Sequence, residues 1–304
     1  KQSIINAVLC LVNPGDEVIL PTPFWVSYSA MVKLAEGTIV EIPTSIESDF
    51  KITPEQLEKA ITPKTKLIMF SSPCNPTGTV YTKDELKALA EVVARHENVY
   101  IISDEIYEHI NFTGQHASMA QFDFIYDRVV TVNGLSKAYA MTGWRLGYIG
   151  APLWIAKACD KIQGQYTSAT CSITQRAAIA ALEGDVETTL TMKAAFLRRR
   201  DLVFQMMQNI KGLKFNNPQG AFYFFPDVSN YFGKTYNGNT INNADDMAMY
   251  LLNEGNLSVV TGSAFGDQNC IRFSYATSDD KLVEAMKRLK IALEKLITQE
   301  IPVS

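Results

Sequence analysis

The sequence predicts an α/β protein with a mostly parallel sheet, followed by a smaller α+β domain. From residue 16 to about residue 151, short runs rich in Val, Ile and aromatic residues alternate with helical patterns. Several of these runs are apolar on both faces, as buried parallel strands must be. After residue 150 the chain becomes a long helical stretch, and from about residue 211 strands and helices mix. We therefore expect a large domain at residues 1–210, ending in a connecting helix, and a small domain at residues 211–304.

The elements of the large domain follow from these runs and from helix boundary signals. The expected strands are residues 17–20, 38–42, 67–70, 99–103, 129–132 and 146–150. Thr53 with Gln56, and Thr82 with Glu85, have the spacing of capping boxes and predict two helix starts. The run Asn13-Pro14-Gly15 predicts the end of the first helix.

The second half of the chain is predicted to be richer in helix. Expected helices are residues 177–183, 189–210, 244–253 and 279–297, and expected strands are residues 222–225, 257–260 and 271–274. Residues 198–200, three consecutive arginines, predict a solvated helix face, and residues 237–239 predict a loop.

Composition excludes several classes of protein. The 304 residues contain 28 Lys+Arg and 32 Asp+Glu, a formal charge of -4, whereas nucleic-acid platforms have a basic excess. No apolar run approaches the roughly 20 residues that span a bilayer, so we expect no membrane partner. The five cysteines are odd in number and form no CxxC pair, which predicts neither a disulfide framework nor zinc, and favours a reducing cytoplasm. The three histidines have no spacing typical of metal ligands, so no metal site is predicted.

Polar residues follow several of the predicted strands, where open parallel sheets bind their ligands. Asn75 follows the third strand, Asp104 and Tyr107 the fourth, and Lys137 the fifth. Taken singly, each has a simpler interpretation: a turn, a helix cap or a surface lysine. However, Arg145 lies eight residues after Lys137, where its fork can bind a phosphate beside an amine that forms an imine.

The stretch around Lys137 carries a resemblance to a known family. Residues 134–147 read G-L-S-K-A-Y-A-M-T-G-W-R-L-G, which is similar to the lysine signature of the class I aminotransferases. These are pyridoxal 5'-phosphate enzymes of fold type I. Residues 72–78, 103–107, 220–223 and 272–276 resemble the same family, and the likeness covers essentially the whole chain. Because the chain opens with Lys1 and lacks the family's usual N-terminal portion, we expect a fragment or a processed form.

The resemblance implies roles for individual residues toward the cofactor. Lys137 would form an imine with the cofactor aldehyde and then move a proton from the substrate α-carbon. Asp104 would keep the pyridine nitrogen protonated, and Tyr107 would support the catalysis. The remaining cofactor contacts would be Asn75 and Tyr107 on the ring oxygen, Ser136 and Arg145 on the phosphate, and Trp25 stacked on the ring.

The resemblance also implies how a substrate binds. Arg272 would clamp the α-carboxylate, with Asn75 and Trp25 beside it. Residues 1–6, K-Q-S-I-I-N, resemble a bacterial subgroup whose lysine binds the distal carboxylate of aspartate or glutamate; alternatively, Lys1 is simply exposed.

The implied function is transfer of the amino group of aspartate, or a related amino acid, to 2-oxoglutarate by a homodimer. Aminotransferases for aromatic amino acids, alanine or prephenate remain alternatives, as do β-elimination lyases and a non-catalytic truncated relative. A nicotinamide dehydrogenase is disfavoured because no strand is followed by G-x-G-x-x-G.

Overall fold

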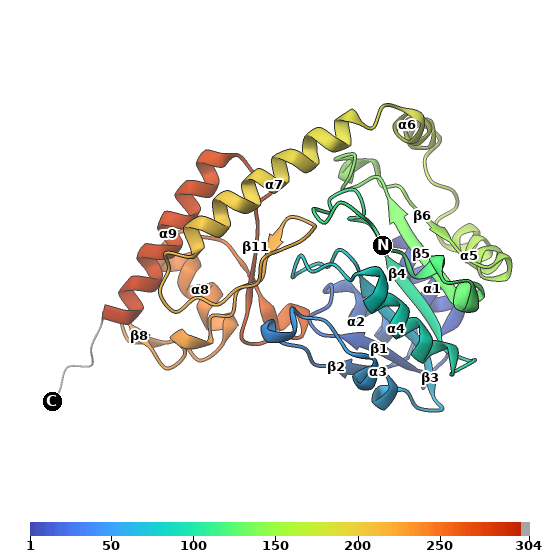
Figure 1. Cartoon of the computed structure of the whole chain (residues 1–304), viewed down its shortest axis with the longest axis horizontal. Coiled ribbons are helices and arrows are strands. Elements are labelled where there is room, and N and C mark those ends of the chain that lie inside the picture. Colours follow the sequence, from blue (N-terminus) through green and yellow to red (C-terminus); the bar gives the residue numbers. More distant parts are fainter. Residues whose placement is uncertain (299–304) are drawn as a thin grey trace.

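The first part of the chain is built around a six-stranded sheet (Figure 1). A computed structural model describes residues 1–298. The strand order is β2-β1-β3-β4-β5-β6. The strands are β1 (Glu17–Pro21), β2 (Thr38–Ile42), β3 (Thr65–Ser71), β4 (Tyr100–Asp104), β5 (Val129–Gly134) and β6 (Gly147–Gly150). All neighbouring pairs are parallel except β5 and β6. The predicted α/β class with a mostly parallel sheet is confirmed.

The last strand differs from its neighbours. β6 is antiparallel to β5, because only a short stretch containing a 3-10 turn (Thr142–Trp144) joins them, too little chain for a helical crossover. β6 is also largely exposed, whereas β3 and β4 are buried along almost their whole length. The expected burial on both faces therefore holds for the central strands and fails at this edge.

Helices cover both faces of the sheet, and alternate residues of each strand point to opposite faces. On one face, Leu67 and Met69 pack with α1 (Gln2–Leu11), α2 (Ser27–Leu34) and α5 (Leu153–Tyr166). On the other face, Ile68 and Phe70 pack with α3 (Pro54–Ala60) and α4 (Lys83–Ala94). The two core layers hold the carboxyl ends of the strands at one edge.

The predicted helix boundaries in this part are present. Thr53 caps α3 by accepting a hydrogen bond from the Gln56 N–H, and Thr82 caps α4 by accepting from the Glu85 N–H. Both are complete capping boxes. α1 ends at Leu11, just before the predicted stop at residues 13–15.

Two further helices lead to the second part of the chain. α6 (Ser172–Glu183) is followed by the long α7 (Glu187–Met207), which runs from the sheet to the region that contains α8 (Ala244–Gly255) and α9 (Asp279–Thr298) (Figure 1). The strands β7 (Tyr223–Phe224), β10 (Val260–Thr261) and β11 (Ile271–Ser274) form an antiparallel sheet in the order β10-β11-β7. Of the strand predicted at residues 257–260, only Val260 is in a strand, β10, which also includes Thr261.

The predicted loop at residues 237–239 is the tip of a hairpin. β8 (Thr235–Tyr236) and β9 (Asn239–Thr240) pair around Asn237 and Gly238, which have φ values of 49° and 81°. Positive φ at both central residues is the hallmark of the type I′ turn that Asn-Gly favours. The turn residues were visible in the sequence, but the two-residue strands beside them were too short to predict.

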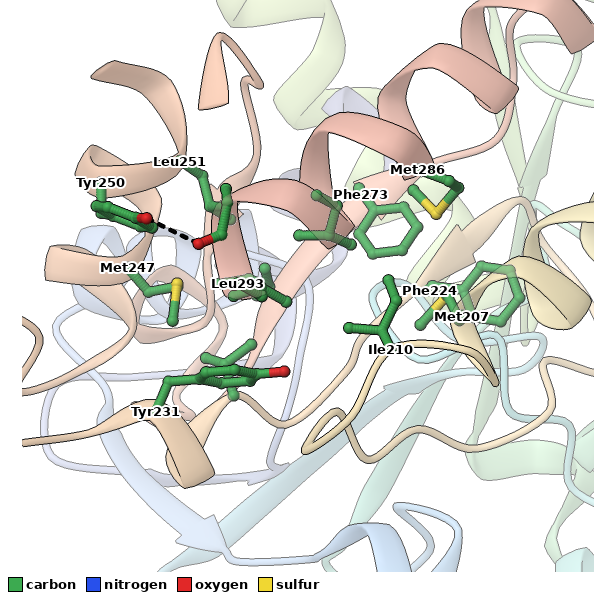
Figure 2. Close-up of a cluster of buried hydrophobic side chains, with 14 of the residues drawn as sticks. Met207, Ile210, Phe224, Tyr231, Met247, Tyr250, Leu251, Phe273, Met286 and Leu293 are labelled. Atoms are coloured by element: carbon green, nitrogen blue, oxygen red, sulfur yellow. Dashed lines mark hydrogen bonds between the residues drawn. The ribbon is translucent and has the colours of Figure 1, made fainter. Parts of the chain in front are cut away.

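The second part has its own hydrophobic core (Figure 2). Phe224 and Phe273 from the antiparallel sheet pack with Met207, the last residue of α7, and with Ile210 in the turn after it. The Tyr250 hydroxyl of α8 donates to the Ala292 carbonyl of α9 at 2.7 Å, which satisfies a buried phenol. The last turns of α7 thus belong to this core, and the domain boundary after residue 210 stays a prediction.

Backbone hydrogen bonds join the two parts beside the edge where the strands end. The Phe24 N–H donates to the Phe265 carbonyl at 3.0 Å, and the Gly220 N–H donates to the Gly78 carbonyl at 2.9 Å. Added Cβ atoms at Gly78 and Gly220 would come within 3.0 Å of neighbouring atoms, so this contact requires glycine. Among residues 1–298, no helix is both long and apolar enough to cross a membrane.

Candidate active site

A cavity of about 620 Å³ lies beyond the carboxyl ends of β3, β4 and β5. All of the predicted site residues line it, although they come from both parts of the chain. They are Lys1, Trp25, Asn75, Asp104, Tyr107, Ser136, Lys137, Arg145 and Arg272. The cavity therefore lies where open parallel sheets bind their ligands, beyond the carboxyl ends of the strands. Arg272 reaches it from β11, in the second part of the chain.

Asp104 ends β4 as a buried carboxylate that is 5% exposed. Its Oδ2 accepts a hydrogen bond from the Tyr28 hydroxyl at 2.8 Å, and its Oδ1 accepts from the Ile106 N–H at 3.2 Å. Burial raises the pKa of Asp104, and these two hydrogen bonds offset the effect only in part. The anion is therefore incompletely compensated by the protein and suits a cationic partner in the cavity.

Lys137 lies three residues beyond the end of β5, and its side chain is half-buried. Its Nζ lies 5.7 Å from the ring centre of Tyr107 and 5.3 Å from that of Phe222. Burial lowers the pKa of Lys137, the charge of Arg272 lowers it further, and Asp104 acts in the opposite direction. A lowered pKa raises the fraction of neutral amine, which is the nucleophilic form.

Arg272 contacts two aromatic rings. Its guanidinium carbon lies 4.5 Å from the ring centre of Tyr223 and 4.8 Å from that of Phe265. Its Nη1 donates to Asn75 Oδ1 at 2.8 Å. These three contacts restrict the orientation of the planar guanidinium, as recognition of a carboxylate requires.

Tyr107 connects this group to the strand ends. Its hydroxyl lies 3.0 Å from the Tyr223 hydroxyl, and both rings are buried. Burial raises the pKa of Tyr107 well above the usual range, so its phenol keeps its proton at physiological pH. Tyr107 can therefore act as a hydrogen-bond donor in the cavity.

The residues predicted to bind phosphate lie at a more open part of the cavity. Ser136 is half-buried and Arg145 is exposed. Arg145 has φ of 55°, in the left-handed region that non-glycine residues rarely adopt, and its Nη1 donates to the Thr142 carbonyl. An unusual backbone conformation at an exposed cavity residue is typical of a functional position.

Lys1 and Trp25 form another wall. The Lys1 Nζ lies 5.3 Å from the Trp25 ring centre, within the range of a cation–π contact. The Trp25 ring meets Tyr28 edge to face, with centres 5.5 Å apart. Trp25 is therefore held between a cation and the phenol that contacts Asp104.

Sequence reasoning missed three residues that shape the site. Tyr28 lies in the first turn of α2, and no sequence signal pairs its hydroxyl with Asp104. Tyr223 belongs to residues 220–223, which already resembled the family, but no role was assigned to it. Phe265 lies in a 3-10 turn (Gly262–Phe265) of the second part, and no sequence signal connects it with Arg272.

No metal site was predicted, because the cysteines form no CxxC pair and the histidines have no spacing typical of metal ligands. The structure places His116 Nε2 at 2.8 Å from Glu105 Oε2, with Glu108 close by. The other oxygen of Glu105 accepts hydrogen bonds from Ser103 and Ser118. These bonds already account for both oxygens of Glu105, and the group anchors the loop that carries Tyr107.

Comparison with known proteins places the chain in a family. Residues 1–289 match the model of aminotransferase class I and II. A bifunctional aspartate aminotransferase and glutamate/aspartate-prephenate aminotransferase of Petunia hybrida is 49% identical over 298 residues, covering 96% of this chain and 62% of the relative. An aspartate/prephenate aminotransferase of Cereibacter sphaeroides is 50% identical over 300 residues, covering 95% of this chain and 73% of the relative.

Solved structures agree with this assignment. The crystal structure of the aspartate aminotransferase from Rhizobium meliloti superimposes with a TM-score of 0.94 at 43% identity, covering 97% of this chain and 74% of that one. An aromatic aminotransferase from Pyrococcus horikoshii superimposes with a TM-score of 0.91 at 38% identity, covering 97% and 77%.

The fold is thus that of the fold type I pyridoxal-phosphate enzymes. The chain belongs to the aminotransferase class I and II family, and the resemblance read from the sequence is confirmed. The chain spans somewhat under two thirds of the length of the Petunia relative and about three quarters of the others.

The cavity fits the cofactor of this family, pyridoxal 5'-phosphate. Lys137 offers an amine with a lowered pKa, and Asp104 offers a buried anion that lacks a full cationic partner. Arg145 offers a guanidinium at the open side of the same cavity. An aldehyde, a protonated ring nitrogen and a phosphate are the groups that this donor set complements.

Proposed function

We propose that the chain transfers the amino group of aspartate to 2-oxoglutarate with pyridoxal 5'-phosphate as cofactor. The observation that carries the proposal is the meeting of Lys137, Asp104 and Arg272 in one cavity, although they lie far apart in the sequence. The names of the Petunia, Cereibacter and Rhizobium relatives all include aspartate aminotransferase or aspartate/prephenate aminotransferase, which supports this substrate.

The cofactor supplies an aldehyde that condenses with amines and a ring that draws electrons from the substrate α-carbon. Lys137 would have two roles: its Nζ would hold the cofactor, and the free amine would carry the proton that leaves the substrate α-carbon. Its neutral form is favoured because burial and Arg272 lower its pKa. The Asp104 carboxylate would balance the positive charge of the ring nitrogen.

The remaining residues orient the reactants. Asn75 and Tyr107 would hydrogen-bond the ring oxygen of the cofactor, Trp25 would pack on its ring, and Ser136 and Arg145 would bind its phosphate. Arg272 takes the α-carboxylate through both nitrogens of its fork, and Asn75 holds that fork at 2.8 Å.

Lys1 is proposed to bind the distal carboxylate of the substrate. Its ammonium lies over Trp25 at the cavity wall, so it can move toward a ligand without leaving the site. A monocarboxylic amino acid lacks the group that this ammonium would pair with, and this difference would give the preference for aspartate.

A second candidate is transfer to prephenate, because the names of the Petunia and Cereibacter relatives include it. A steady-state screen separates the possibilities. It pairs glutamate with oxaloacetate, phenylpyruvate, pyruvate or prephenate as acceptor. We expect the highest kcat/KM with oxaloacetate. Absence of turnover with dicarboxylic substrates would refute the aspartate assignment, and absence of all turnover would favour a non-catalytic relative.

We propose that the chain works as a homodimer in the cytoplasm. Large apolar side chains are exposed on α5, on α6 and just before α7, and we call them the apolar patch: Leu153, Trp154, Tyr166, Ile173, Leu182 and Val186. Exposed apolar side chains of this size suit burial against a second copy of the chain. The five cysteines are all free thiols, which supports a reducing compartment.

A further inference from the structure

Three side-chain amides form a hydrogen-bonded series along one wall of the cavity. Gln2 Nε2 donates to Asn6 Oδ1 at 2.7 Å, within the first turns of α1. Asn6 Nδ2 donates to Gln163 Oε1 on α5, also at 2.7 Å. All three residues line the cavity. The series therefore connects two helices that are more than 150 residues apart in the sequence.

The series continues into the turn that follows α5. Gln163 Nε2 donates to Thr167 Oγ1 at 2.7 Å and to the Ser168 carbonyl at 2.6 Å. Ser168 has φ of 57°, so the chain turns sharply there. Thr170, two residues on, lines the cavity. One side chain, Gln163, thus holds both α1 and this turn.

The central amide is a support and not a ligand for substrate. Asn6 is 4% exposed, its oxygen accepts from Gln2, and its nitrogen donates to Gln163. The side chain is almost fully buried and bonded to a neighbour at both ends, so it offers little surface to a substrate. Buried amides whose bonds are made in this way fix geometry, because breaking one bond leaves a polar group unsatisfied.

The first turn of α1 is held by one apolar anchor and by this series. The side chain of Lys1, at the N-cap position, makes no capping hydrogen bond, and the first turn contains no acidic residue. Ile4 packs into the core from the first turn, and the other apolar anchors, Ala7, Val8 and Leu11, lie further along the helix. Among the hydrogen bonds between side chains, the one from Asn6 to Gln163 ties the start of α1 to α5.

We propose that Asn6 and Gln163 are positioning residues that hold Lys1 at the cavity and so set the preference for ligands with two carboxylates. The inference rests on the role proposed above for Lys1. It extends the determinant of specificity from one cation, Lys1, to the amide series that supports it.

The test compares succinate with propionate, a dicarboxylate and a monocarboxylate that share the chain's α-carboxylate site but undergo no reaction. Calorimetry on the cofactor-loaded protein gives the ratio of the two dissociation constants. In Gln163→Leu, which keeps the bulk and removes the hydrogen bonds, we expect this ratio to fall by roughly five- to tenfold. Asn13→Ala, an exposed amide beyond the other end of α1, should leave it unchanged.

A double-variant comparison shows whether Gln163 acts through Lys1. Lys1→Ala should lose the succinate preference, and adding Gln163→Leu should lower it no further, because both changes remove the same interaction. If Gln163→Leu folds poorly, Gln163→Glu keeps the acceptor for Asn6 and should retain more of the preference than Asn6→Ala.

Each outcome decides between the possibilities. Any of three results overturns the inference. Gln163→Leu could weaken the binding of succinate and propionate equally, or leave the ratio of their dissociation constants unchanged. The native protein could also show no preference for succinate. A lost preference in Gln163→Leu supports it even if the native protein fails to turn over aspartate. That last result would refute the proposed function alone, so the two failures are distinguishable.

Discussion

Replacing Asp104 by Asn should raise the stability of the cofactor-free chain and lower its affinity for the cofactor. The carboxylate is buried with two hydrogen bonds, yet burial still raises its pKa. The folded chain without cofactor therefore bears a cost for keeping this group ionised. An amide of the same shape removes the charge, and its oxygen can still accept from the Ile106 N–H while its nitrogen donates to the Tyr28 hydroxyl.

We expect the cofactor-free Asp104→Asn chain to be more stable than the native chain by about 1–2 kcal/mol at neutral pH. The thermal midpoint should rise by roughly 2–4 °C for each kcal/mol. The direction of the pKa shift of Asp104 also determines how the stability of the chain changes with pH. Because the folded-state pKa of Asp104 is raised, the native chain gains stability as the pH falls through that value, and the advantage of the variant should disappear in acid.

Cofactor binding should change in the other direction. Losing one partner of a buried charge pair costs about 2–5 kcal/mol. The dissociation constant of pyridoxal 5'-phosphate should therefore rise by about 30-fold to a few thousand-fold. Differential scanning calorimetry of the cofactor-free chain and a cofactor titration measure the two effects. Asp127→Asn, an exposed carboxylate of the same sheet domain, is the control. A destabilised cofactor-free variant, or unchanged cofactor affinity, would contradict the assignment of Asp104.

Two further variants test the substrate site and the assembly. Phe265→Leu removes one of the two cation–π contacts of Arg272, a contact worth about 0.5–2 kcal/mol, so the KM of both substrates should rise about 2- to 30-fold with kcat nearly unchanged. Steady-state kinetics check this, and an unaltered KM would show that Phe265 does not orient Arg272. Ile173→Asp places a charge in the apolar patch at a residue that is 72% exposed. Sedimentation velocity should show a dimer for the native chain and a larger monomer fraction for the variant, and a native monomer would refute the dimer.

The site residues that follow strands could be predicted because the position depends on local sequence and one topological rule. Asn75, Asp104 and Lys137 each come after a run that is recognisably a buried strand, and parallel strands end at a common edge. Arg272 was identified only through the family resemblance, because nothing in its own strand indicates which part of the sheet it will face.

Contacts between distant segments could not be predicted in the same way. Arg200 was expected on a solvated helix face, and this prediction was wrong: its side chain is 11% exposed, and it donates to the Pro218 carbonyl at 2.8 Å. Similarly, Gln163 meets Asn6 only because α1 and α5 pack on the same face of the sheet. Periodicity reports which face of a helix is apolar, and not which polar residue finds a partner across the fold.

The position of the covalently bound cofactor tests the account most directly. The chain would be loaded with pyridoxal 5'-phosphate, reduced with borohydride, digested and analysed by mass spectrometry. We expect a phosphopyridoxyl group on Lys137, and no such group in Lys137→Ala. Reduction that labels a different lysine, or none at all, would contradict the placement of the chemistry beside Asp104.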